Sequence, residues 1–244
     1  MKTIEEINKW SYKEAWQFFN ENAINRYVPE LKLYFQSLEK NCKTIDLRDD
    51  KDARKKILES VKGKKTLILV DGSSLNGKTT FANRLSNCID CEIVDIDILC
   101  IQWIEKHLNK VQVPFERNLF ISKIDRLTDE FILDNLEKII QEKSTKTVIL
   151  VGCYIELLYR AIISKTLGKY FDQVVSIYFC AKTYKEIKML FKKREEEFKN
   201  FKMNIDVFEQ YQYSKKLLEY NGYPLGVGMD VSFIADIHVS DMFV

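Results

Sequence analysis

The chain has 244 residues, of which 46% are hydrophobic and 30% are charged. This composition is typical of a folded globular protein and excludes a disordered or fibrous chain. The formal net charge of +2 gives no basis for binding nucleic acid or a membrane surface through charge, so we expect neither as a partner.

No stretch of the sequence has the properties of a membrane span or an export signal. The longest apolar runs, such as residues 66–70 and 148–151, are far shorter than the roughly 20 residues that cross a bilayer. The first ten residues contain charged side chains and lack the apolar centre of a signal peptide. One close cysteine pair, Cys88 and Cys91, is weak support for a metal or redox site. Free cysteines without an export signal predict a cytoplasmic protein.

Residues 1–62 have the pattern of a helical extension. Apolar side chains recur near the helical period over residues 4–19 and again over residues 31–38. A third helix is expected over residues 52–61, because Gly63 then provides a residue suited to end it. We therefore predict an N-terminal helical extension that ends at residue 62.

From residue 63 onward, short apolar runs alternate with helical patterns. The expected strands are residues 66–70, 92–96, 147–151, 174–179 and 235–239, and the expected helices are residues 78–87, 98–108, 120–141, 156–167 and 184–220. The first run does not alternate apolar with polar residues, as expected for a strand buried on both faces of a parallel sheet. We predict an α/β domain over residues 63–244, with a parallel sheet flanked by helices on both faces.

The strongest motif follows the first expected strand. The segment Gly72-Ser73-Ser74-Leu75-Asn76-Gly77-Lys78-Thr79, followed by Thr80, matches G-x-x-x-x-G-K-[ST] at every fixed position. Its glycines let backbone N–H groups turn inward around phosphate oxygens, and the helix N-terminus adds free donors. In this pattern Lys78 reaches the β- and γ-phosphates, and the Thr79 hydroxyl ligates magnesium. We therefore predict a three-layer P-loop NTPase fold that binds a nucleoside triphosphate with Mg²⁺.

Two acidic residues near the end of the second expected strand indicate chemistry beyond binding. Asp95 and Asp97 are two residues apart and are expected on one side of that strand, at its carboxyl end. A carboxylate there can accept the proton of an attacking hydroxyl and hold a magnesium-bound water. We predict Asp97 as the general base and a magnesium ligand, and Asp95 as the alternative base or a substrate contact. The competing interpretation is that both aspartates only solvate the end of the strand.

Together these features resemble the P-loop small-molecule kinases, a group that includes uridine kinase, chloramphenicol phosphotransferase and the zeta-toxin kinases. The resemblance covers about residues 64–244. It rests on the strand with Asp-Gly-Ser-Ser-x-x-Gly-Lys-Thr-Thr, the Val-Asp-Ile-Asp strand end, the basic segment at residues 191–194 and the Ala-Asp-Ile-x-Val-Ser ending. It implies ATP and Mg²⁺ as cofactors and a five-stranded parallel sheet in the order 2-3-1-4-5.

The resemblance also implies roles for individual residues. Asp97 corresponds to the aspartate that activates the acceptor, and Arg194 corresponds to a lid arginine that stabilises charge on the transferring phosphoryl group. The backbone near Ser240 would lie beside adenine. In the acceptor pocket, Arg117 could hold an anionic or hydroxyl-rich substrate, and Tyr154 would border it. An isolated arginine such as Arg117 is more often a solvated residue.

The sequence thus predicts an ATP- and Mg²⁺-dependent kinase that phosphorylates a hydroxyl of a small molecule. The expected acceptor is a nucleoside-like, vitamin-like or antibiotic compound. Lys78, magnesium at Thr79 and Arg194 would neutralise charge, and Asp97 would accept the proton. The alternative is a nucleotide-binding regulatory module with slow or no ATP hydrolysis. A kinase toxin that acts on a cell-wall nucleotide also stays open, as does the oligomeric state.

Overall fold

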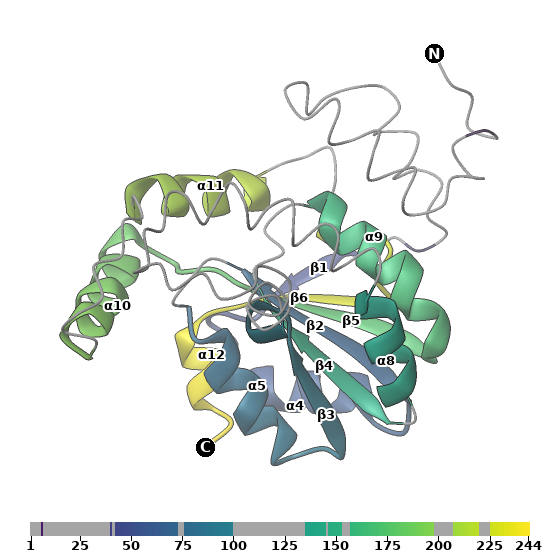
Figure 1. Cartoon of the computed structure of the whole chain (residues 1–244). Helices are drawn as coiled ribbons and strands as arrows, with labels where there is room; N and C mark the ends of the chain where they lie inside the picture. The colour runs from purple at the N-terminus through teal and green to yellow at the C-terminus, as the bar shows by residue number, and fades with distance from the viewer. Residues whose placement is uncertain are drawn as a thin grey trace, which may run out of the picture.

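The computed structural model describes residues 6, 40, 42–72, 76–99, 135–144, 146–152, 157–197, 207–219 and 225–244. Within these ranges the chain forms an α/β fold built on one sheet (Figure 1). No helix of these ranges is long and apolar enough to cross a membrane.

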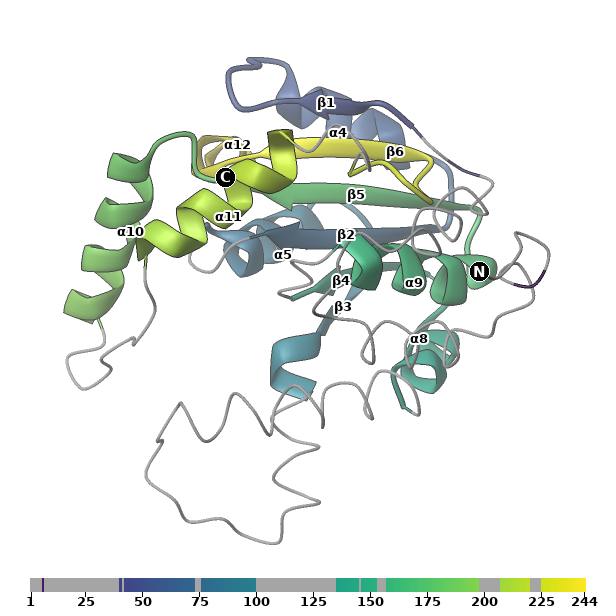
Figure 2. The same cartoon turned by 90° about the horizontal axis from the view of Figure 1, so that it is seen from above.

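The described residues form a parallel sheet of six strands. They are β1 (Thr44–Asp46), β2 (Thr66–Gly72), β3 (Cys91–Asp95), β4 (Thr147–Val151), β5 (Gln173–Phe179) and β6 (Val231–Ala235). The order from edge to edge is β1-β6-β5-β2-β4-β3, as Figure 2 shows. Because every pair is parallel, all carboxyl ends lie along one edge, which is where ligands bind in open α/β sheets.

The predicted five-stranded sheet is wrong, because β1 adds a sixth strand by pairing with β6. β1 lies within the residues predicted as a helical extension. It is three residues long and two of its side chains are exposed, so it lacks the apolar signal of a buried strand. The extension is otherwise described only at residues 6, 40, 42, 43 and 47–62. There the helix predicted at residues 52–61 is confirmed as α4 (Ala53–Val61), and the domain boundary stays a prediction.

The last predicted strand is also wrong. β6 ends at Ala235, and the chain then begins α12 (Ile237–Asp241) instead of continuing as a strand to residue 239. Asp236 causes this change, because its carboxylate accepts hydrogen bonds from two backbone N–H groups at the start of the helix. The other four predicted strands are confirmed as β2, β3, β4 and β5, with bounds that differ by no more than two residues.

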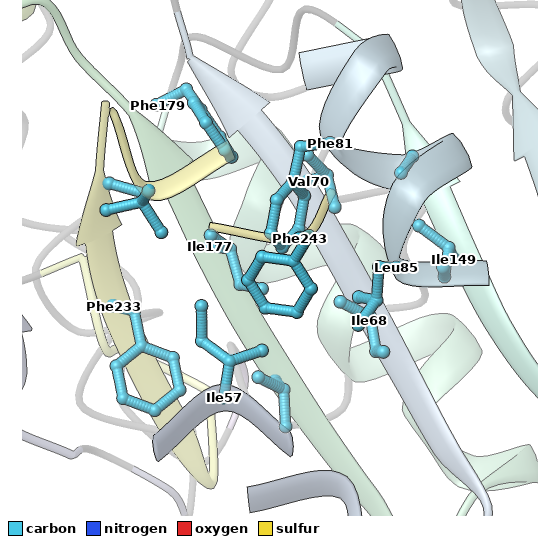
Figure 3. Packing of buried hydrophobic residues seen from close by; sticks show 14 of the residues in the cluster. Ile57, Ile68, Val70, Phe81, Leu85, Ile149, Ile177, Phe179, Phe233 and Phe243 are labelled. Atoms are coloured by element: carbon cyan, nitrogen blue, oxygen red, sulfur yellow. The ribbon is translucent and has the colours of Figure 1, made fainter. Parts of the chain in front are cut away.

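Helices cover both faces of the sheet, as predicted. One face carries α4, α5 (Lys78–Ser86) and α12, and the other carries α8 (Glu137–Lys143) and α9 (Leu157–Leu167). In the core under α4, α5 and α12, Phe81 of α5 packs against Phe179 of β5 and against Phe243, with ring centroids 5.1 Å apart in both pairs (Figure 3). A short 3-10 turn, η2 (Gly168–Tyr170), leads from α9 into β5.

The central strand β2 contributes to both cores. Ile68 and Val70 belong to the core under α4, α5 and α12, whereas Leu67 and Leu69 belong to the core under α8 and α9. Side chains of a strand point alternately to its two faces. Asp71 therefore lies on the same face as Leu69, toward α9.

The helix predicted over residues 184–220 is two helices. They are α10 (Tyr184–Glu197) and α11 (Val207–Glu219), and residues 198–206 lie outside the described part of the chain. The ring of Tyr184 packs against those of Phe208 and Tyr211, with centroids 5.4 and 5.9 Å away. Because α10 follows β5 directly, it begins at the carboxyl edge of the sheet (Figure 2).

Candidate functional site

The two glycines of the phosphate motif occupy positions that strain other residues. Gly72 ends β2 with a φ of 133°, and a Cβ there would lie 1.9 Å from the carbonyl oxygen of Phe179. Gly77 precedes α5 with a φ of 84°, and a Cβ there would lie 2.7 Å from Ile237 Cδ1 of α12. Residues that have a side chain rarely adopt a positive φ, so both positions favour glycine. The two ends of the loop are thereby packed closely against β5 and α12.

Lys78 is the first residue of α5, and its side chain turns back over the loop. It is 7% exposed, and its Nζ donates a hydrogen bond to the carbonyl oxygen of Gly72 at 2.8 Å. Burying an ammonium group is costly unless it is paired. A lysine in this position acts as a point charge for phosphate. The structure therefore places a positive charge between the two ends of the loop.

The N-terminus of α5 offers further hydrogen-bond donors. Its cap residue is Gly77, which has no side chain that could cap the helix, and the first turn contains no acidic residue. The free N–H groups and the helix dipole at such an end favour an anion. Asn76 is 1% exposed, and neither atom of its side-chain amide has a hydrogen-bond partner among the described residues. Because a buried amide without a partner costs free energy, this loop favours a polar ligand.

Thr79 and Thr80 follow Lys78 in the first turn of α5, and both are exposed. The Thr79 hydroxyl is therefore accessible to a magnesium ion. We call the phosphate motif with the first turn of α5 the cradle. Its middle residues, Ser73, Ser74 and Leu75, lie outside the described residues.

The two candidate aspartates do not lie on one strand. Asp95 is the last residue of β3, and its Oδ1 accepts a hydrogen bond from Ile98 N at 3.1 Å. Asp97 lies in a helical turn at residues 96–99 and is exposed. The strand ends early because Asp95 caps this turn in the manner of a helix N-cap. Asp95 therefore has a structural role, and Asp97 is the more accessible carboxylate.

A buried ion pair that the sequence analysis did not identify lies below the start of the loop. Asp71 of β2 is fully buried, and its Oδ2 lies 3.1 Å from Nε of Arg160 in α9, which is 1% exposed. The guanidinium also hydrogen-bonds the hydroxyl of Ser176 in β5 and lies 5.4 Å from the ring centroid of Tyr178. Burial lowers the pKa of Arg160, and the Asp71 carboxylate opposes this shift. These contacts connect α9 to β2 and β5.

The ion pair reaches the phosphate motif through the backbone. Asp71 Oδ1 accepts a hydrogen bond from Gly72 N at 2.5 Å, and the carbonyl oxygen of Gly72 accepts the bond from Lys78. Arg160 therefore pairs with Asp71, and Asp71 holds the N–H of Gly72, the residue whose carbonyl oxygen Lys78 contacts. The sequence did contain a signal for this pair. Asp71 directly follows the apolar run 67–70, and a charged residue that is buried with such a run is expected to have a partner of opposite charge.

Ser240 does not follow a final strand as predicted. It lies in α12 and is fully buried, and its carbonyl oxygen accepts a hydrogen bond at 2.8 Å from Arg84 in the last turn of α5. The residue of α12 beside the phosphate loop is Ile237, next to Gly77. A contact between Ser240 and a nucleotide stays a prediction.

Three further predicted site residues cannot be placed by their side chains. Arg194 belongs to α10, but its side chain is outside the described part of the structure. Arg117 and Tyr154 lie wholly outside the described residues.

Comparison with known proteins finds similarity only among solved structures. The chain matches no known protein family and no curated protein. A sugar kinase from Janibacter sp. HTCC2649 is 14% identical, with 72% of this chain and 90% of that chain covered and a TM-score of 0.42. A structure of the PezAT toxin-antitoxin system of Streptococcus pneumoniae is 15% identical, with 89% and 76% covered and a TM-score of 0.41.

An uncharacterized protein from Eubacterium ventriosum ATCC 27560 is also similar. It is 14% identical, with 73% of this chain and 96% of that chain covered and a TM-score of 0.34. Likenesses of this size carry no conclusion about activity. The functional proposal for this chain therefore rests on the residues of its own site.

Proposed function

We propose that this chain is an ATP- and Mg²⁺-dependent phosphotransferase that phosphorylates a hydroxyl group of a small molecule. The supporting observation is the cradle between β2 and α5. Three neighbouring features of this cradle favour an anion: the buried Lys78, the N-terminus of α5 with a glycine as its cap residue, and the buried side-chain amide of Asn76, which has no partner among the described residues. The cradle lies at the carboxyl edge of a parallel sheet. Each of these groups binds or stabilises negatively charged oxygen.

In this proposal the cradle holds the phosphates of ATP. Lys78 and the first N–H groups of α5 bind the β- and γ-phosphates, and the Thr79 hydroxyl binds Mg²⁺. Magnesium neutralises charge that develops as the phosphoryl group transfers. Arg194 of α10 adds positive charge to the transferring group, since α10 begins at the same edge of the sheet.

Asp97 is the proposed general base. An acceptor hydroxyl loses a proton as it attacks the γ-phosphate, and an exposed carboxylate beside the sheet edge can take that proton. Asp95 is the less favoured alternative, because its Oδ1 already caps the turn at residues 96–99. Arg117 and Tyr154 are proposed to contact the acceptor, which is a nucleoside-like, vitamin-like or antibiotic compound.

One observation favours a second candidate function. β4 ends at Val151 and is followed by Gly152 and Cys153, so the end of this strand offers no carboxylate to magnesium. A nucleotide-binding regulatory module with slow or no ATP hydrolysis needs less support for the metal than a kinase does. Such a module would bind Mg-ATP without turnover that depends on an acceptor.

The kinase proposal is tested by ADP production from Mg-ATP across nucleosides, sugars, vitamins and aminoalcohol antibiotics. We expect one acceptor to raise turnover at least about a hundredfold, and Asp97→Asn to remove about a hundredfold of the stimulated rate. Glu142→Gln is the matched control, because Glu142 is an exposed carboxylate of α8, and it should retain the rate. Full activity in Asp97→Asn would contradict the base assignment. ATP binding without stimulation by any acceptor would favour the regulatory module.

A further inference from the structure

Three side chains that have no part in the proposed phosphate site converge near α12. They are Glu186 of α10, Asp236 before α12 and His238 of α12, and one ligand atom from each lies within 4.8 Å of the other two. Two carboxylates and an imidazole are ligands of divalent transition-metal ions. Acidic groups often gather without a metal. This cluster differs from such groups in how its carboxylates are held.

Each carboxylate uses one oxygen to cap a helix, which fixes its orientation. Asp236 is the N-cap of α12, and its Oδ1 accepts hydrogen bonds from the backbone N–H groups of His238 and Val239 at 3.1 and 3.2 Å. Glu186 Oε2 accepts a hydrogen bond at 2.8 Å from Lys182 N, just before α10. Outer contacts of this kind orient the ligands of metal sites. Both carboxylates are therefore held in position by the fold itself.

The second oxygen of each carboxylate is buried and unsatisfied. Asp236 Oδ2 and Glu186 Oε1 have no hydrogen-bond partner in the described part of the chain, and Asp236 is only 1% exposed. Burial, together with the charge of Glu186, raises the pKa of Asp236. Carboxylates with oxygen atoms within 4.8 Å of each other repel unless a cation or a proton lies between them.

No lysine or arginine fills this role within the described residues, where neither Glu186 nor Asp236 forms a salt bridge. Hydrogen bonding to Asp46 and, more weakly, the charge of Asp236 raise the pKa of Arg48, but the guanidinium of Arg48 is paired with Asp46. Its Nε and Nη2 donate hydrogen bonds to Asp46 Oδ1 and Oδ2 at 2.9 and 2.6 Å. Lys182 is paired through its Nζ with a different carboxylate, that of Asp49. Two buried carboxylate oxygens without a partner therefore favour a positive ion from solution.

We propose that Glu186, Asp236 and His238 bind one divalent transition-metal ion, Zn²⁺ or Mn²⁺. His238 is exposed, so a coordination position for water is available on its side of the site. Mg²⁺ is less suited, because it prefers oxygen ligands and keeps its waters, whereas imidazole favours transition metals. Its three ligands do not include Thr79, the residue expected to bind magnesium.

A metal here connects two elements that flank the phosphate loop. Glu186 lies in the first turn of α10, and Asp236 immediately precedes Ile237, the residue of α12 that approaches Gly77. The ion therefore ties the start of α10 to the helix that packs against the loop. An ion that binds only the folded chain also raises its stability.

The test is calorimetric titration of the full, tag-free and chelator-treated chain with Mn²⁺ and, separately, with Zn²⁺, in the absence of nucleotide. We expect one equivalent to bind and the thermal midpoint to rise. His238→Ala and Glu186→Gln should each weaken binding at least about tenfold and remove the rise in midpoint. His238 is exposed, and Glu186→Gln keeps a side-chain oxygen to accept from Lys182, so both variants should fold.

Two controls separate this site from others. Glu195→Gln changes an exposed carboxylate of the same helix, and Thr79→Val removes the hydroxyl of the phosphate site; neither should alter binding. Mn²⁺ is decisive, because thiolates favour Zn²⁺ whereas carboxylates and imidazole accept both ions. No stoichiometric binding of either ion would overturn the proposal and leave a shared proton between the carboxylates. Binding that survives His238→Ala and Glu186→Gln, or that is lost in Thr79→Val, would overturn it as well.

Discussion

Gly72 and Gly63 both have a positive φ, but they differ in what surrounds them. At Gly72 a Cβ would meet the backbone of Phe179 at 1.9 Å, whereas at Gly63, with a φ of 72°, no described atom lies within 4 Å of that position. Gly63→Ala should therefore cost only the strain of a left-handed residue, about 1–2 kcal/mol. For Gly72→Ala we expect the free energy of unfolding to fall by at least about 3 kcal/mol, measured by urea denaturation. Equal losses in the two variants would contradict the close approach of β2 and β5.

Some residues of the candidate site could be predicted from the sequence, and others could not. Gly77 and Lys78 were identified because a fixed spacing along the chain encodes the turn and the charge. The partner of Asp71 was not, because Arg160 reaches it only after α9 has packed on the sheet. Asp97 was expected beside Asp95 on one side of a strand over residues 92–96, but the strand ends at Asp95, where a capping hydrogen bond outweighs the apolar pattern.

At the scale of elements, the Asp71–Arg160 pair joins α9 to the strand that leads into the phosphate loop. Arg160→Met keeps the apolar stem but leaves a buried carboxylate without its ion-pair partner. We expect the free energy of unfolding to fall by about 3–5 kcal/mol, again measured by urea denaturation. Lys55→Met is the control, because Lys55 belongs to an exposed pair with Glu59 and should change stability by no more than about 0.5 kcal/mol.

A double-variant cycle shows whether the two side chains act as a pair. Asp71→Asn combined with Arg160→Met should be less destabilising than the sum of the single changes, with a coupling of about 1–3 kcal/mol. The reason is that removing both charges leaves neither one buried alone. Simple additivity would contradict the ion pair as the contact that holds α9 to β2.

Helices and strands were predictable where their signal was local in the sequence. β2, β4 and β5 are short apolar runs on both faces of the sheet, and alternating helices imply a parallel sheet. α12 was missed because five residues are too few to show a helical period, and Ala-Asp-Ile-His-Val also alternates like a strand. β1 was missed because its pairing with β6, far away in sequence, is what makes it a strand.

For the whole molecule, the α/β class and the two helical layers followed from the sequence, but the size of the sheet did not. The site depends on this larger arrangement, because the phosphate loop lies where β2 ends between β4 and β5. Two cores fix β2 from both faces, and the loop is held at one end by β5 and at the other by α12. The position of the phosphate loop is therefore set by its packing against β5 and α12 as well as by its own sequence.

The most direct test of the account is calorimetric titration of the full chain with Mg-ATP. We expect one equivalent to bind, and Lys78→Ala to weaken binding at least about tenfold, because it removes the buried charge between the ends of the loop. Lys62→Ala, an exposed lysine after α4, is the matched control and should bind as the unaltered chain does. Absence of binding, or equal affinity in Lys78→Ala and Lys62→Ala, would contradict the assignment of this loop as a nucleotide-phosphate site.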